Sequence, residues 1–176
     1  MPQESPPIPA HRKLLAALLV GLSLSAGCGG RLVDGVYRAP DDRYRVQAPP
    51  APWVATSLKS DEVVFRNPGL QAAIAVLSHC TDPEPGALSW VARHLFFGLR
   101  DREVESQEMG SLRGEPAVRT RLRARLDGAP VVVEALTVRG GGCLYDLVYV
   151  APPATAAAGR PDFETFVQSW TPRAAP

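Results

Sequence analysis

The stretch Val118-Arg119-Thr120-Arg121-Leu122-Arg123-Ala124-Arg125-Leu126 runs directly into Asp127-Gly128 and then into Ala129-Pro130-Val131-Val132-Val133. Apolar or small residues alternate with arginines over the first nine positions, and this period of two is typical of a β-strand with one buried face. Asp-Gly predicts a type I′ turn, because both central residues of that turn need positive φ. The sequence therefore predicts an antiparallel hairpin in which residues 130–139 return beside residues 118–126.

The predicted turn also fixes which residues face each other across the hairpin. It pairs Leu126 with Ala129, Ala124 with Val131 and Leu122 with Val133. The same register places Arg121 opposite Glu134 on the other face of the hairpin, where we expect an exposed ion pair. Such a pair contributes about 0.2–1 kcal/mol, so we expect Glu134→Ala to change the stability little.

The rest of the chain shows further strand and helix patterns around this hairpin. Strand-like segments are 43–48, 62–66 and 71–79 before it and 143–150 after it. Helical spacing predicts one helix from Pro85 or Ala87 to Leu99, and a last helix at 161–170 that buries Phe163, Phe166, Val167 and Trp170. We read residues 154–159 as a loop. This order predicts an α+β fold, a single antiparallel sheet packed with two main helices.

The order of elements resembles the PsbP-like and DcrB-like families of small extracytoplasmic domains. The shared features are an early Tyr44-Arg45-Val46 followed by prolines and Trp53, a central helix, a three-strand meander and a closing helix. The resemblance extends from about Tyr37 to Trp170 and implies a PsbP-like α/β sandwich. It implies no catalytic residues, because those families share none that could be assigned to positions here.

The N-terminus carries a different signal. His11-Arg12-Lys13 is followed by an apolar run of about 11 residues and by Ser25-Ala26-Gly27-Cys28, the pattern of a secretory signal peptide. The run is shorter than the roughly 20 residues that a membrane span needs. Cys28 after Ser-Ala-Gly resembles the lipobox of bacterial lipoproteins, which implies cleavage before Cys28 and lipid on its thiol. The alternative is an ordinary secretory signal cut near Ala26, which would leave Cys28 a plain thiol.

We therefore divide the chain into a lipoprotein signal peptide (1–27), a lipidated tether (28–36) and a single α+β domain (37–172). The resemblance implies a lipid-anchored protein of the bacterial cell envelope, facing the periplasm or the exterior. Gly29, where retained lipoproteins tend to carry Asp, resembles the pattern of outer-membrane sorting. Without residues 1–27 the chain has 17 basic and 17 acidic residues. Zero net charge argues against nucleic-acid binding and against broad electrostatic adhesion to membranes.

Three cysteines occur in the chain, and lipid on Cys28 leaves Cys80 and Cys143 as a pair. Extracytoplasmic proteins form disulfides readily, so we predict a bond between the two. Two separate buried thiols are the alternative.

His79, Cys80, His94 and Cys143 are the sequence's one group of soft metal ligands, and a zinc or copper site built from them is conceivable. The close paired spacing of zinc motifs is missing. A Cys–His nucleophile oriented by Asp146 is the corresponding enzymatic alternative. No phosphate-binding loop, nucleophile elbow or His-Glu-x-x-His motif supports an enzyme. We expect no metal, no cofactor and no catalytic activity.

Two surfaces remain as candidates for binding. The first is the row Arg119, Arg121, Arg123 and Arg125, which could bind lipid phosphates, an acidic glycan or an acidic partner, or could simply be a solvated face. The second is a pocket for a small apolar ligand lined by Trp53, Trp90, Phe96 and Phe97. Our leading hypothesis is a non-enzymatic, lipid-anchored module that binds a partner protein or envelope component. A small-ligand carrier is the alternative.

Overall fold

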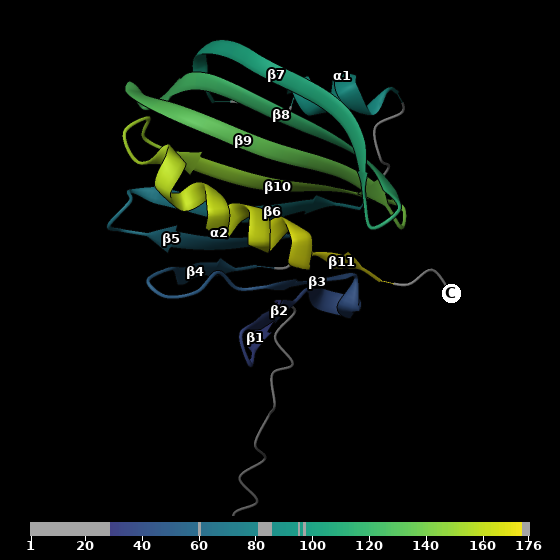
Figure 1. Ribbon diagram of the computed structural model, residues 1–176. Coiled ribbons are helices and arrows are strands. Elements are labelled where there is room, and N and C mark those ends of the chain that lie inside the picture. The colour runs from purple at the N-terminus through teal and green to yellow at the C-terminus, as the bar shows by residue number, and fades with distance from the viewer. Residues whose placement is uncertain (1–28, 60, 81–85, 95, 97, 174–176) are drawn as a thin grey trace, which may run out of the picture.

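The computed structural model describes residues 29–59, 61–80, 86–94, 96 and 98–173. Two antiparallel sheets and two α-helices make up this part of the chain (Figure 1). The α+β class is confirmed, whereas the expectation of a single sheet is wrong. The predicted signal peptide and Cys28 lie outside the described residues.

The smaller sheet joins the first and last strands of the described part of the chain. Its strands are β1 (Arg31–Val33), β2 (Val36–Arg38), β3 (Tyr44–Gln47) and β11 (Thr171–Pro172), in the order β1-β2-β3-β11. A 3₁₀ turn, Pro40–Asp42, connects β2 to β3. The segment that we expected to act as a tether therefore enters the fold already at Arg31. Pro49, Pro50 and Pro52 follow β3 and separate it from the second sheet, because proline has no backbone N–H to donate to a ladder.

The larger sheet holds the other seven strands. They are β4 (Val54–Leu58), β5 (Glu62–Asn67), β6 (Ala72–His79), β7 (Arg100–Leu112), β8 (Glu115–Leu126), β9 (Ala129–Gly140) and β10 (Cys143–Ala151). Their order is β4-β5-β6-β10-β9-β8-β7, so β10 joins the late meander to the early strands. Strands β4 and β7 are the two edges of this sheet.

The hairpin of β8 and β9 matches the prediction in turn and in register. Asp127 and Gly128 both have positive φ, 51° and 84°. Leu126 pairs with Ala129, Ala124 with Val131, Leu122 with Val133 and Arg121 with Glu134. This local turn therefore sets the pairing along the whole length of the two strands.

The two helices cover opposite faces of the larger sheet (Figure 1). Helix α1 (Leu88–His94) is shorter than predicted and packs on β8 and β9. Helix α2 (Ala156–Ser169) begins inside the segment that we read as a loop, and it contains Pro161. Its alanines are strong helix formers, which explains the earlier start. No helix of the described residues is long and apolar enough to cross a membrane.

The main core lies between α2 and the sheets. Phe163, Phe166, Val167 and Trp170 are fully buried there, as their spacing predicts. Tyr145 meets Trp170 and Tyr44 edge to face, with ring centroids 5.1 and 5.4 Å apart. These aromatic contacts join the small sheet to the large one, so the described residues of both sheets share one core.

Candidate functional site

The four arginines of β8 project from the face of the large sheet that α2 partly covers. Val118, Leu122 and Ala124, at alternate positions, are buried against the other face. The Arg119 side chain is 27 % exposed, whereas that of Arg123 is 65 % exposed. The row therefore begins in a semi-buried site beside α2 and ends on an open surface.

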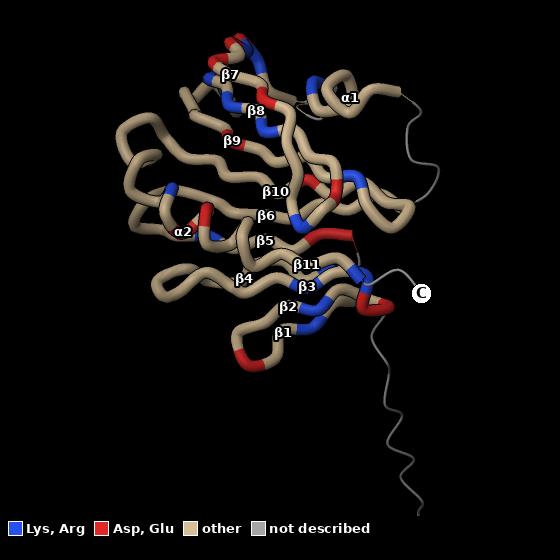
Figure 2. The backbone as a smooth tube through the Cα atoms, turned by 45° about the vertical axis from the view of Figure 1, so that its right-hand side comes forward, with Lys and Arg blue, Asp and Glu red and all other residues tan. Residues whose placement is uncertain are grey.

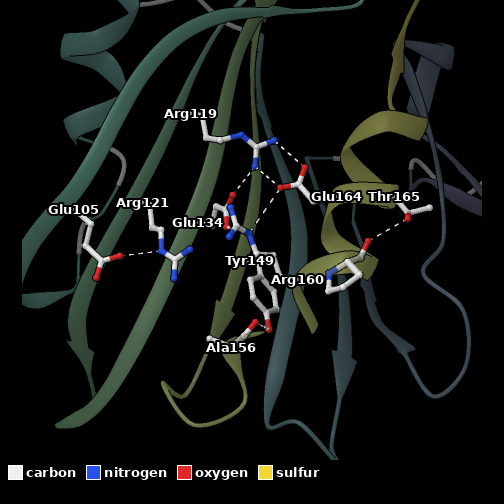
Figure 3. Close-up of polar contacts among 10 residues, drawn as sticks. Glu105, Arg119, Arg121, Glu134, Tyr149, Ala156, Arg160, Glu164 and Thr165 are labelled. Carbon is white, nitrogen blue, oxygen red and sulfur yellow. Dashed lines mark hydrogen bonds and ion pairs between the residues drawn. The ribbon is translucent and has the colours of Figure 1, made fainter. Parts of the chain in front are cut away.

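At the semi-buried end, Arg119 takes part in a cluster with Glu134 of β9 and with Arg160 and Glu164 of α2 (Figure 3). Glu134 is only 3 % exposed; Arg119 donates to one of its oxygens, and Arg160 Nε lies 3.2 Å from the other. Arg119 also donates to both oxygens of Glu164, at 2.7 and 3.1 Å. The expected exposed pair between Arg121 and Glu134 does not form, because Glu134 is buried and its two carboxylate oxygens already bind Arg119 and Arg160.

At the open end, β7 supplies the acidic partners. Arg121 Nε and Arg123 Nε lie 2.8 and 2.7 Å from the two oxygens of Glu105 (Figure 3 shows the first contact). Arg125 Nε lies 3.4 Å from Asp101, and Arg125 also donates to the carbonyl oxygen of Gly128 at 2.7 Å. The row is thus a network of charges rather than a set of free cations.

The sequence patterns did not indicate the acidic residues of β7 or the two helical members of the cluster. Arg160 and Glu164 stand four residues apart, a spacing that brings charged side chains together on a helix. This spacing could have predicted the pair, but residue 160 was expected to lie before the helix. Glu105 had no such signal, because irregular pairing between β7 and β8 at 104–106 decides its position.

A groove of about 180 Å³ runs between α2 and the strands β7 and β8. Its lining includes Glu108, Leu112, Arg119, Leu136 and Val167. Drug-sized ligands bind in pockets of roughly 300–1,000 Å³, so this groove is small for such a ligand.

The structure does not bring together the residues of the predicted apolar pocket. Trp53 is buried on the α2 side, and its indole N–H donates to Asp162 at 2.8 Å. Phe96 is buried on the opposite face of the sheet, and Trp90 is half exposed on α1. Phe97 lies outside the described residues.

Cys80 and Cys143 form the predicted disulfide, with Cα atoms 4.1 Å apart. The bond continues the register in which His79 of β6 pairs with Leu144 of β10. Both sulfurs are thereby engaged, which leaves neither as a thiolate nucleophile. His79 is exposed, and the side chain of His94 is not described. The described residues contain no group of three or more His, Cys, Asp or Glu that could hold a metal ion.

Asp146 does not lie with the disulfide. Its carboxyl points to the α1 side of the sheet, whereas Cys143 packs in the core on the α2 side. Asp146 is almost completely buried, and neither oxygen has a hydrogen-bond partner of normal geometry among the described residues. Burial raises the pKa of Asp146 to about 7, and the Thr137 hydroxyl on the paired strand offsets only part of this effect.

Comparison with solved structures identifies the fold. The chain is similar to cyanobacterial PsbP (CyanoP) from Synechocystis, with a TM-score of 0.60 and 16 % identity over 88 % of this chain and 98 % of that one. It is also similar to PA94 from Pseudomonas aeruginosa, a protein of unknown function described as a putative regulator. That TM-score is 0.56, with 15 % identity over 74 % of this chain and 92 % of that one.

A third similar structure comes from Bacteroides thetaiotaomicron, with a TM-score of 0.57 and 10 % identity over 79 % of this chain and 48 % of that one. No family model matches the chain, and no curated protein matches it. At these identities the comparisons show the fold alone. The chain thus has a PsbP-like fold, as the order of its elements implies.

Proposed function

We propose that the protein is a non-enzymatic binding module of the cell envelope, anchored by lipid on Cys28, and that an extended segment of a partner protein docks along β7. The anchor rests on the lipobox-like sequence before Cys28. The described chain begins at Gly29, one residue after it. Strands β1 and β2 lie at one end of the molecule and β7 at the other (Figure 1), so β7 would point away from the membrane.

The free edge of β7 is the observation that carries this proposal. The strand is 13 residues long, and within the described part of the chain no strand pairs with its outer edge. Such an edge presents a row of unpaired backbone groups that an added strand can use. From Ser106 to Leu112 the pairing with β8 is regular, which leaves this segment free of the irregularities near residues 101–105.

Side chains beside this edge indicate the chemistry of the partner. Met109 is 67 % exposed and Val104 is half exposed, so both offer apolar contacts. The guanidinium groups of Arg123 and Arg125, on the neighbouring strand β8, are the most exposed of the row, and Glu105 and Asp101 of β7 pair with them. An extended segment with apolar side chains fits these features.

A photo-crosslinking residue in place of the exposed Ser111 of β7 tests the proposal in intact cells. We expect a discrete adduct of defined mass that disappears in the variant Met109→Lys. Val54→Lys is the matched control, because Val54 is also exposed and lies on β4, the opposite edge strand. No adduct, or an adduct that survives the Met109→Lys substitution, would overturn docking on β7.

A further inference from the structure

Three arginines lie in a row across the small sheet. Arg31 of β1 pairs directly with Arg38 of β2, and Arg38 pairs with Arg45 of β3. Residues paired in this way share a face of the sheet, with neighbouring strands about 4.8 Å apart. The alternate residues Tyr37 and Tyr44 are buried in the core, so the row, here named the basal arginine row, lies on the outer face.

Few carboxylates neutralise the basal arginine row. Asp42 accepts hydrogen bonds from Arg45, and these bonds lower its pKa, as do the charges of Arg38 and Arg173 nearby. Asp41 binds Arg43 instead. No ion pair holds Arg31 or Arg38 within the described ranges. One carboxylate therefore faces several guanidinium groups, and positive charge remains on this surface.

The surface also has a hollow beside the row that is large enough for a phosphate-containing group. A hollow of about 410 Å³ lies next to Arg45 and is lined by Asp42, Thr171, Pro172 and Arg173 as well. Arg45 and Arg173 both line this hollow, so two guanidinium groups lie beside it. Their donors can bind phosphate oxygens, since guanidinium groups match the geometry of phosphate.

The position of the row in the chain, close to Cys28, indicates what kind of surface it contacts. Arg31 is the third residue after Cys28, and three residue steps of extended chain span at most about 10 Å. That reach is close to the Debye length of about 8 Å at physiological ionic strength. Exposed Leu32, Val33 and Leu58 lie on the neighbouring segments. Figure 2 shows the basic positions of β1, β2 and β3 gathered at one end of the molecule.

We propose that the basal arginine row binds the headgroups of anionic phospholipids and so seats the small sheet on the membrane surface. This inference rests on the lipid anchor of the proposed function. The lipid would hold Arg31 near the bilayer, where each arginine gains attraction to an anionic surface. The seated small sheet would then fix the direction in which β7 projects.

Vesicle co-sedimentation tests the inference with the chain 29–176, which retains every described helix and strand. We expect this chain to bind vesicles of phosphatidylglycerol at low salt and not vesicles of phosphatidylcholine. The variant Arg31→Gln/Arg38→Gln should bind phosphatidylglycerol about tenfold or more weakly, because two surface arginines are neutralised. Added salt should weaken the binding of the parent chain.

The matched control is Arg93→Gln/Arg102→Gln, which removes the same charge from exposed residues of α1 and β7 at the opposite end. This control should bind as the parent does. Equal binding by the Arg31/Arg38 variant, or an equal loss in the control, would overturn the inference. The chain 29–176 lacks Cys28, so this outcome is independent of whether Cys28 carries lipid in the cell.

Discussion

The carboxylate of Glu134 binds the guanidinium group of Arg119, although Arg121 is the residue directly across from it on the paired strand. Helix α2 explains this diagonal choice. Arg160 and Glu164 of this helix lie beside Glu134 and Arg119 and form ion pairs with them (Figure 3). Arg121 lies outside the part of the sheet that α2 covers, and it binds Glu105 of β7 instead.

Glu134→Gln should therefore destabilise the fold, contrary to what an exposed pair would imply. The substitution keeps the volume but leaves two arginines facing an uncharged amide in a site with little water. We expect a loss of about 1–3 kcal/mol in the free energy of unfolding, measured by urea denaturation. Glu105→Gln is the matched control and should cost about 0.2–1 kcal/mol, since its partner Arg123 is largely exposed. Equal effects of the two substitutions would contradict this account.

Local patterns predicted the hairpin well, and long-range packing explains what they missed. Asp127-Gly128 fixes a turn by its own backbone preferences, so the register of β8 and β9 follows from neighbouring residues. The partner of Glu134 depends on a helix some 30 positions further along the chain, which no local pattern of β8 and β9 describes.

The second sheet escaped prediction for a similar reason. Strand β11 has only two residues, and it pairs with β3 from the opposite end of the chain. Such a short strand has no readable period, and tertiary packing alone assigns its partner. The disulfide was predictable because the prediction needed only the expected compartment and the number of cysteines.

Asp146 should make the stability depend on pH. Its carboxyl has a pKa of about 7 in the folded chain and about 3.8 when unfolded. Folding therefore favours the protonated form. The free energy of unfolding should fall as the pH rises from about 4 to about 7 and should then level off. Thermal or urea unfolding across this range measures the slope.

Asp146→Asn should remove that slope, because an amide does not titrate. At pH 8 the variant should gain stability, by up to about 4 kcal/mol if the whole shift is expressed. Asp127→Asn, in the exposed turn, is the control and should keep the slope of the parent chain. A parent protein whose stability rises between pH 4 and 7 would rule out a buried, neutral Asp146 as the dominant group.

The Cys80–Cys143 bond should contribute strongly to stability. It closes a loop between residues 63 positions apart, for which chain entropy gives roughly 4 kcal/mol. Cys80→Ser/Cys143→Ser should lower the free energy of unfolding by up to this amount. Alkylation of the unreduced, unfolded parent should modify neither cysteine. Two modified thiols at these positions, read from the intact mass, would contradict the bond.

Gly159 should resist replacement even by alanine. A Cβ there would lie 2.5 Å from the hydroxyl oxygen of Tyr149 and 3.2 Å from Leu70, where α2 approaches the sheet. Gly→Ala ordinarily stabilises a helix interior by up to about 1 kcal/mol. Here we expect a loss of about 1–3 kcal/mol from the clash. Adding Tyr149→Phe removes the nearest atom, so the double variant should lose less than the sum of the two single variants.

Cys28→Ala tests the anchor on which the orientation of the molecule depends. With lipid on Cys28 the protein should sediment with membranes, because two or more acyl chains hold a protein there stably. The alanine variant has no thiol to modify, so it should either leave the membrane fraction or accumulate as an uncut precursor. Mass spectrometry of the N-terminal peptide distinguishes these outcomes and should find the acyl groups on Cys28 of the parent. A variant that stays on the membrane and is cut at the same place would show that Cys28 is not the anchor. The basal arginine row alone would then have to account for the membrane association, and neutralising Arg31 and Arg38 in the alanine variant would test it directly.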